Sequence, residues 1–270
     1  MPDAFRIFRL SFHQNRLLMR LTTIGTGTVS PHSSRVSAAH LVEVGDARIL
    51  FDCGGGAMHR MAHLGIRWQD ITHVALSHFH ADHISDLPLL MLAWRYGQLP
   101  PRSEPLSIIG PPGTSELMTN LASAFGEWVL DPGYPFSITE LPPGDTAEPV
   151  NDVQLRARSV PHTAESVAYS VEHDGRRLVY TGDTGYEEEL GTWASECDIL
   201  LTECSLPAAM GLPTHLTPEE CGSLAAIARP SHLVLTHFYP PVETVDIAAI
   251  VAERFTGRIT LATDGWTTEF

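Results

Sequence analysis

The sequence contains no lysine, so all 17 basic residues are arginines. This absence excludes Schiff-base chemistry and a lysine nucleophile. Positive charge is scarce as well, because 32 acidic residues bring the formal net charge to −15. A protein that coats nucleic acid broadly needs positive surface to neutralise phosphates, so the charge argues against one and leaves only a local arginine patch.

The chain also lacks an apolar run near the ~20 residues that a membrane-spanning helix needs. Its richest apolar stretch, Leu87–Trp94, is short and is broken by Pro88. The N-terminus carries arginines but no apolar core of the kind found in secretory signals. Four cysteines show neither C-x-x-C spacing nor a small-domain disulfide framework. We therefore expect a cytoplasmic protein with reduced thiols and no membrane contact.

The order of apolar patterns predicts an α/β protein. Residues 1–18 are expected to form a loosely attached extension, and residues 19–270 a single domain. Strands are expected at Arg20–Ile24, His40–Val44, Arg48–Asp52, His73–Ser77, Leu106–Ile109, Pro135–Leu141, Gln154–Val160, Ser166–Glu172, Arg177–Thr181, Ile199–Glu203, Leu233–Thr236 and Arg258–Ala262. Helices are expected at Ala57–Leu64, Ile84–Tyr96 (helical after Pro88), Gly113–Trp128, Tyr186–Ala194, Thr217–Ala228 and Val245–Arg254. Early meander strands followed by β/α alternation predict two mixed sheets sandwiched by helices.

The most informative segment is His78-Phe79-His80-Ala81-Asp82-His83, which follows an expected buried strand. Imidazole and carboxylate groups are ligands that Zn²⁺ accepts. On an extended or looping backbone His78 and His80 point the same way, while Asp82 and His83 follow at a turn where they can face a second ion. A histidine-rich solvated loop is the alternative, and the buried strand before the segment disfavours it.

This His-x-His-x-Asp-His pattern resembles the signature of the metallo-β-lactamase superfamily, and the resemblance extends over most of the chain from Met19. Further elements match in the family's order: Asp52 before Cys53-Gly54-Gly55, then Pro161-His162-Thr163, Gly182-Asp183-Thr184 and Thr236-His237-Phe238. Taken alone, His162, Asp183 or His237 would more often be structural. Because they occur in the family's order, the role of a metal ligand is favoured for each of them. The resemblance also implies the family's four-layer αββα sandwich.

The resemblance also implies a dinuclear metal centre. One ion would be held by His78, His80 and His162, and the other by Asp82, His83 and His237, with Asp183 as the bridge. Zn²⁺ is the expected ion, and Mn²⁺ or Fe²⁺ stays open because the same ligands accept all three. Two ions ~3.5–4 Å apart share a hydroxide whose pKa falls toward neutrality, and this hydroxide would be the nucleophile. Asp82 is therefore expected to be catalytic as well as a ligand, and Asp52 to orient a ligand histidine.

Two later residues favour one branch of the family. Glu203 and His215 resemble the glutamate and histidine of ribonuclease Z and related phosphodiesterases, although Thr202 stands where ribonuclease Z often has a histidine before the glutamate. A carboxylate beside an imidazole raises its pKa and fixes its tautomer. We expect His215 to bind a phosphate oxygen or protonate the departing alkoxide, with Glu203 as its catalytic partner. An exposed loop residue before a helix cap is the alternative for His215.

Arg35 is a further expected substrate-binding residue, because the loop after the first strand commonly borders the site in this family. Its guanidinium could contact a phosphate.

The favoured function at this stage is a metal-dependent phosphodiesterase acting on a small or cyclic phosphodiester. A ribonuclease Z that processes tRNA 3′ ends usually has a long arm between the third metal histidine and the bridging aspartate. Here only 20 residues separate His162 from Asp183, and they read as a hairpin around His173-Asp174-Gly175. The net charge of −15 also disfavours tRNA. Ribonuclease Z activity stays the alternative, as does a lactone, thioester or β-lactam hydrolase that does not use His215.

Two other classes remain open, since fold alone does not give function. One is a non-catalytic metal-binding or interaction module, which no substituted ligand position supports. The other is a redox di-iron protein, which would usually pair with a flavin domain that we do not find. The expected partner is a small molecule, with structured RNA less expected and a homodimer left open.

Overall fold

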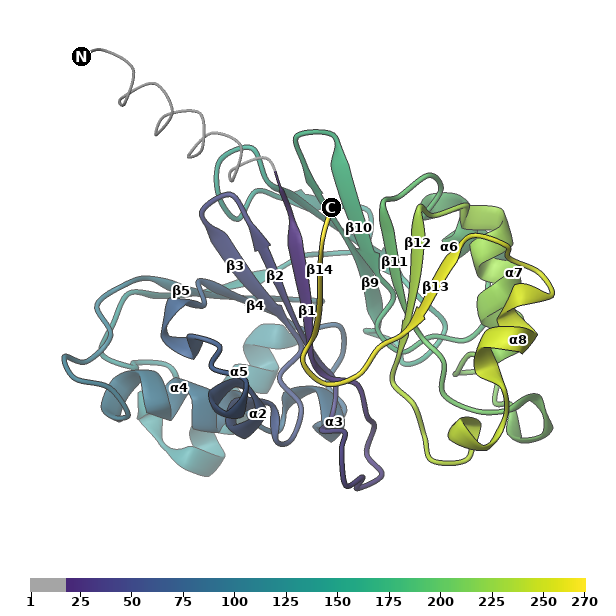
Figure 1. Ribbon diagram of the computed structural model, residues 1–270. Helices are drawn as coiled ribbons and strands as arrows, with labels where there is room; N and C mark the ends of the chain where they lie inside the picture. Colours follow the sequence, from purple (N-terminus) through teal and green to yellow (C-terminus); the bar gives the residue numbers. More distant parts are fainter. Residues whose placement is uncertain (1–17) are drawn as a thin grey trace, which may run out of the picture.

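The computed structural model describes residues 18–270 and shows two β-sheets facing each other, with helices on both outer sides (Figure 1). Each sheet has seven strands. The four-layer αββα sandwich expected from the sequence is thereby confirmed. Residues 1–17 of the expected extension lie outside the described residues.

The first sheet has the strand order β14-β1-β2-β3-β4-β5-β6. Its strands are β1 (Arg20–Gly25), β2 (Ala39–Val44), β3 (Ala47–Phe51), β4 (His73–Ala75), β5 (Leu106–Gly110), β6 (Phe136–Glu140) and β14 (Trp266–Glu269). Strand β2 shows why the sheet is buried on both sides. Its Val42 and Val44 pack in the core between the sheets, whereas Ala39 and Leu41 pack against the outer helices.

The second sheet has the strand order β13-β12-β11-β10-β9-β8-β7. Its strands are β7 (Thr146–Ala147), β8 (Gln154–Ser159), β9 (Val167–His173), β10 (Arg176–Tyr180), β11 (Ile199–Glu203), β12 (His232–Thr236) and β13 (Arg258–Leu261). The pairs from β10 to β13 are parallel, so their carboxyl ends meet at one edge. The segment between His162 and Asp183 forms the β9–β10 hairpin, as expected, with Asp174 and Gly175 at positive φ.

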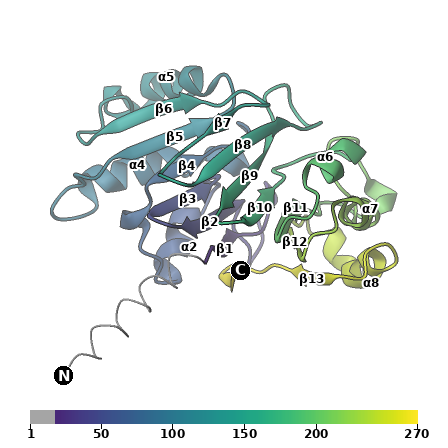
Figure 2. The same ribbon diagram turned by 90° about the horizontal axis from the view of Figure 1, so that it is seen from above.

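Helices cover the outer face of each sheet (Figure 2). The first sheet is covered by α2 (Ala57–His63), α4 (Leu87–Tyr96) and α5 (Thr114–Phe125), and the second by α6 (Glu188–Trp193), α7 (Pro218–Ala228) and α8 (Ile247–Ala252). Shorter helical segments are α3 (Ala81–Ile84) and the 3₁₀ turns η1 (Trp68–Asp70), η2 (Glu127–Val129), η3 (Ala208–Met210) and η4 (Val242–Thr244). None of the helices in the described part of the chain is long and apolar enough to cross a bilayer.

Local differences from the expected elements have identifiable causes. Helix α4 begins at Leu87, ahead of Pro88, because proline fits the first helical turn, where its missing N–H has no partner to lose. Asp82 and His83 lie in the short helix α3 rather than at an open turn. Helix α5 is shorter than expected because it ends at Gly126, and η2 follows as a separate turn.

Two sequence signals are confirmed, and two strands were missed, the two-residue β7 and β14. Thr217, the first residue of the expected helix, is the N-cap of α7 and forms a reciprocal capping box with Glu220. The four cysteines are buried and unpaired. Strand β14 was not expected, yet it pairs antiparallel with β1 from Arg20↔Glu269 to Thr23↔Trp266. The last strand of the chain therefore completes the sheet that the first strand begins.

His40 on β2 is fully buried, and neither of its ring nitrogens has a hydrogen-bond partner in the described part of the chain. Its ring packs edge-on against Tyr180, with ring centroids 5.1 Å apart. Burial, together with the neighbouring His83 and His237, lowers the pKa of His40 to about 3. The folded protein therefore holds this imidazole neutral at pH values where the unfolded chain would protonate it.

We expect His40 to destabilise the protein as the pH falls. The unfolded chain takes up a proton near pH 6.5 and the folded chain does not, so stability is present above that pH and is lost below it. Between about pH 7.5 and about pH 5, the free energy of unfolding should fall by about 2 kcal/mol more in the wild type than in His40→Leu. Urea unfolding of both proteins at the two pH values measures the difference. If the free energy of unfolding fell equally in both proteins, His40 would not be the neutral buried histidine described here.

Candidate metal centre

The candidate site lies at the end of the sandwich beside α3, where chain segments from both sheets meet (Figure 1). The strand order explains this convergence. Asp183 follows β10, Glu203 ends β11 and His237 follows β12, and these parallel strands point the same way. In the first sheet β3 and β4 are also parallel, which places Asp52 beside the start of the histidine-rich segment.

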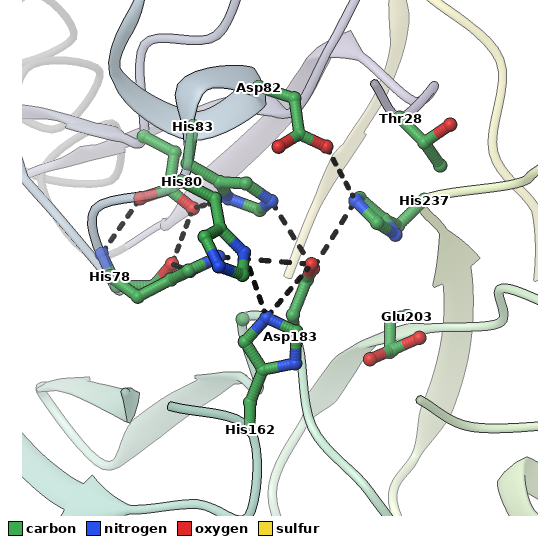
Figure 3. Close-up of polar contacts among 12 residues, drawn as sticks. Thr28, His78, His80, Asp82, His83, His162, Asp183, Glu203 and His237 are labelled. Atoms are coloured by element: carbon green, nitrogen blue, oxygen red, sulfur yellow. Dashed lines mark hydrogen bonds and ion pairs between the residues drawn. The ribbon is translucent and has the colours of Figure 1, made fainter. Parts of the chain in front are cut away.

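The first group of possible ligands contains His78, His80 and His162. Their ligand atoms all lie within 4.8 Å of one another. The closest pair is His162 Nε2 and His80 Nδ1, which are 3.1 Å apart. Figure 3 shows these side chains approaching from the loop before α3 and from the segment after β8. This is the group that the sequence predicts for one ion.

The second group contains Asp82, His83 and His237, which also lie within 4.8 Å of one another. His237 Nε2 is 3.5 Å from Asp82 Oδ2. Asp183 lies between the two groups. Its Oδ2 is 3.9 Å from the Nε2 atoms of His78 and His162, and its Oδ1 is 3.3 Å from those of His83 and His237. The structure thus brings together all seven side chains that the sequence singled out as ligands.

In four of the histidines the Nδ1 atom, which we call the outer ring nitrogen, lies next to an oxygen atom. His78 Nδ1 is 3.0 Å from Ser77 Oγ, His83 Nδ1 2.8 Å from Asp52 Oδ2, His162 Nδ1 2.9 Å from the Thr214 carbonyl and His237 Nδ1 3.0 Å from Ser205 Oγ. A carbonyl or carboxylate oxygen can only accept, so it fixes the Nδ1–H tautomer and leaves Nε2 with a free lone pair. Metal-binding histidines in proteins are oriented in this way.

The inner atoms are buried and unpartnered. The Nε2 atoms of His78, His83 and His237, together with Asp183 Oδ1, have no hydrogen-bond partner among the described residues. Leaving such atoms unpaired away from water is costly, and the cost disappears when a cation accepts their lone pairs. Their mutual orientation and their nitrogen and oxygen chemistry fit divalent ions.

The pKa shifts of these side chains also fit the binding of a divalent cation. Burial, with the neighbouring His83, lowers the pKa of His78 to about 3, so this ring is neutral and able to ligate. Burial opposes ionisation of Asp183, but His237 and His83 outweigh it and hold the pKa of this carboxyl well below its usual value. Burial likewise opposes protonation of His83, but Asp183 and Asp52 outweigh it and raise its pKa. A cation bound at His83 Nε2 would displace that proton.

Asp52 anchors the segment that carries four of the possible ligands. Its Oδ2 accepts from the Ser77 hydroxyl at 2.8 Å, from His83 Nδ1 at 2.8 Å and from the Tyr180 hydroxyl at 2.7 Å, while Oδ1 accepts from the Ser77 amide at 2.8 Å. Asp52 is fully buried and has a positive φ of 59°. The adjacent Gly54 leaves no room for a side chain, because a Cβ there would lie 2.0 Å from the Asp82 carbonyl oxygen. The backbone at Gly54 therefore packs directly against α3, the short helix that carries Asp82 and His83.

Glu203 and His215 form a buried pair next to the ligands. His215 Nδ1 lies 3.1 Å and 3.2 Å from the two oxygens of Glu203. Burial opposes protonation of His215, but Glu203 outweighs it and raises its pKa. Glu203 also accepts from the Thr184 amide at 2.6 Å, from the Leu216 amide at 3.2 Å and from the Ser205 hydroxyl. The pairing expected from the sequence is present, and His215 is 9% exposed rather than an open loop residue.

Arg35 has its guanidinium largely engaged by the protein. Its Nε donates to Glu243 at 2.8 Å, and its Nη1 donates to the Thr26 hydroxyl at 2.6 Å and to the Ala262 carbonyl at 2.8 Å. The guanidinium also lies 4.6 Å from the centre of the Phe238 ring. These contacts fasten the loop after β1 to segments of the second half of the chain. Contact with a phosphate stays a prediction.

Three site residues were missed in the sequence. Ser77 and Ser205 hold the outer nitrogens of His78 and His237. Tyr239 packs edge-on against His237 and His215, with ring centroids 5.8 Å and 6.0 Å apart. The available signals were only adjacency: Ser77 directly precedes His78, and Tyr239 follows His237 by two residues. Neither serine nor tyrosine at such a position identifies a role without the fold.

Comparison with known families matches residues 47–238 to a family model described as the beta-lactamase superfamily domain. Ribonuclease Z of Mycolicibacterium gilvum (strain PYR-GCK) is 29% identical over 273 residues, covering 92% of this chain and 94% of the relative. Ribonuclease Z of Mycobacterium bovis (strain BCG / Pasteur 1173P2) is 30% identical over 273 residues, covering 92% of this chain and 96% of the relative.

Solved structures share the fold. The metallo-beta-lactamase fold protein YhfI from Bacillus subtilis has a TM-score of 0.80 at 23% identity, covering 94% of this chain and 99% of that protein. The short form of human tRNase Z has a TM-score of 0.75 at 22% identity, with coverages of 92% and 98%. A diphosphatase from the PhnP family has a TM-score of 0.67 at 19% identity, with coverages of 94% and 97%.

Replacement of Asp52 by asparagine should weaken both the fold and the metal centre. An amide has one accepting oxygen where the carboxylate has two, so buried donors among Ser77, His83 and Tyr180 lose their partner. We expect the free energy of unfolding to fall by about 2–3 kcal/mol and metal affinity to fall by about 10–100-fold. Denaturant unfolding and elemental analysis measure the two effects.

Asp70→Asn is the matched control, because Asp70 pairs with Arg67 at the surface. Such exposed pairs contribute little to stability. If Asp52→Asn behaved like this control, the proposed anchoring role of Asp52 would be wrong.

Proposed function

The chain belongs to the metallo-β-lactamase superfamily of metal-dependent hydrolases, and we propose that it cleaves phosphodiester bonds at a centre of two divalent ions. The observation that carries the proposal is the Glu203–His215 pair. It lies directly beside the possible ligands, since the His215 ring is 4.9 Å from the ring of His162 and 5.9 Å from that of His237. Cleavage of a phosphodiester releases an alkoxide, and a protonated imidazole at this position can neutralise it.

The proposed ligand groups are His78, His80 and His162 for one ion and Asp82, His83 and His237 for the other, with one Asp183 oxygen facing each. Bound ions would supply a hydroxide near neutral pH and offset the charge on the phosphate oxygens. Zn²⁺ is the proposed ion, and Mn²⁺ or Fe²⁺ fits the same donors.

The chain's own groups have separate tasks in this proposal. Glu203 holds Nδ1 of His215, so the mobile proton lies at Nε2, the only ring nitrogen left free. His215 binds a phosphate oxygen through Nε2 and gives the proton to the departing oxygen. Asp183 keeps the two ligand groups at a fixed separation, which fixes where the phosphate must lie.

For the substrate we propose RNA, with cleavage of the ribonuclease Z type. The support comes from relatives of that name that match this chain over 94% and 96% of their own length. Those matches cover nearly the whole length of the relatives, so they support RNA as the substrate although only 20 residues separate His162 from Asp183 in this chain.

A small phosphodiester is the second candidate, and two observations favour it. The net charge of −15 repels a polyanion at long range. Arg35, the arginine expected to meet a phosphate, is engaged by Glu243 and two oxygen acceptors. RNA binding would therefore depend on local contacts at the metal centre, whereas a small diester needs little more than that centre.

A substrate panel separates the candidates. We expect the enzyme loaded with Zn²⁺ or Mn²⁺ to cleave a tRNA precursor with a 3′ trailer and also, more slowly, bis(p-nitrophenyl) phosphate, and to lose both activities after treatment with a chelator. Gel analysis of the RNA and absorbance of p-nitrophenol measure the two reactions. Turnover of the small diester without RNA cleavage would favour the second candidate. Fast hydrolysis of a lactone with no phosphodiester activity would contradict the proposal.

His215→Ala should lower phosphodiester turnover by about 10²–10⁴-fold, because a positioned proton donor contributes about that much. The number of bound ions should stay the same, since His215 is not one of the proposed ligands. Steady-state kinetics and elemental analysis provide the two readouts. The matched control is His63→Ala, an exposed histidine in the last turn of α2, which should change neither. A parallel loss of metal in His215→Ala would make His215 a ligand instead.

A further inference from the structure

Ser205 lies between a carboxylate and a possible metal ligand. Its hydroxyl donates to Glu203 Oε2 and lies 3.0 Å from His237 Nδ1. All three side chains are buried, with Ser205 at 0%, Glu203 at 1% and His237 at 2% exposure. Water therefore does not compete for these hydrogen bonds.

The chemistry of the groups sets the direction of the chain of hydrogen bonds. An ionised carboxylate can only accept, so the single hydroxyl hydrogen of Ser205 points to Glu203. The oxygen of Ser205 then has lone pairs free to accept the Nδ1–H of His237. This leaves the lone pair of His237 on Nε2, the atom that is unpartnered and lies 3.3 Å from Asp183 and 3.5 Å from Asp82.

The same arrangement occurs in the first sheet. There the Ser77 hydroxyl donates to Asp52 Oδ2 at 2.8 Å and lies 3.0 Å from His78 Nδ1. Asp52 also binds His83 directly, as Glu203 binds His215 directly. Each buried carboxylate thus holds one histidine by direct contact and a second one through a serine hydroxyl. The repetition on two different sheets indicates that the serine contact is a way of orienting a ligand.

We propose that Ser205 is a positioning residue for His237, and that Glu203 through it anchors the second ligand group as well as His215. The proposal rests on the metal centre of the proposed function. It assigns Glu203 two tasks, of which a pairing with His215 alone includes only one. Loss of Glu203 should therefore reduce metal binding, whereas loss of His215 should not.

The test is retention of zinc by the purified holoenzyme across a series of chelator concentrations, measured by elemental analysis. For Ser205→Ala we expect one of the two ions to leave at a chelator concentration about 10–100-fold lower than in the wild type. Glu203→Gln should lose zinc at least as readily, and Ser205→Thr, which keeps the hydroxyl, should restore retention. His215→Ala should hold zinc like the wild type.

Ser170→Ala is the matched control, because Ser170 is also fully buried in the second sheet and bonds to Arg177 and Glu172 away from the metal centre. Its zinc retention should not change. A loss equal to that of Ser205→Ala would mean that truncating any buried serine loosens the site, and would overturn the proposal.

A second readout reports on the hydrogen bond itself. In the zinc-loaded wild type, NMR should show an exchange-protected Nδ1–H signal from His237. Ser205→Ala should lose the protection of this signal and keep that of His83, whose proton goes directly to Asp52. Wild-type retention of zinc in Ser205→Ala with an unchanged His237 signal would overturn the proposal. A wild-type protein that retains no zinc would instead overturn the metal centre of the proposed function.

Discussion

The structure is organised around a cluster of imidazole nitrogens that the fold buries but does not satisfy. The Nδ1 atoms of His78, His83, His162 and His237 each have an oxygen partner, while the Nε2 atoms of three of these histidines have no hydrogen-bond partner within residues 18–270. Asp183 supplies an anion between the two groups of possible ligands, and each of its two oxygens faces one group. Without cations this arrangement leaves polar atoms unpaired in a dry interior. The two sheets, the strand ends and the outer hydrogen bonds all serve to hold it.

That these seven side chains lie together could be predicted from the sequence because much of the signal is local. His78, His80, Asp82 and His83 lie within six residues, and the remaining possible ligands follow expected strands. The two-sheet architecture could be predicted as well, since apolar alternation marks most of the strands. Strand β14 could not, because its Thr267, Thr268 and Glu269 have no apolar pattern and become a strand only through pairing with β1.

The roles of Ser77, Ser205 and Arg35 depend on contacts that the tertiary fold creates. The spacing of residues in the sequence does not predict such contacts. A serine beside a histidine in the sequence, such as Ser77, is common and identifies no role. The roles of Ser77 and Ser205 follow from the hydrogen bonds that their hydroxyls donate to Asp52 and Glu203. Arg35 is a similar case. Its position in a loop near the site suggested a phosphate contact, which stays a prediction, and its contact with Glu243, 208 residues further along the chain, could not be foreseen. The partner of a loop side chain depends on which groups the tertiary fold brings within reach.

The pairing of β14 with β1 has a consequence for the order in which the protein can form. During synthesis, β1 emerges from the ribosome almost 250 residues before β14, the strand that pairs with its edge. Until then an unpaired strand edge is exposed, which invites association with other chains. Asp264, just before β14, also binds the amides of Thr26 and Val36 in the loop after β1. The loop after β1 and the free edge of β1 therefore gain these partners only once Asp264 and β14 have been translated.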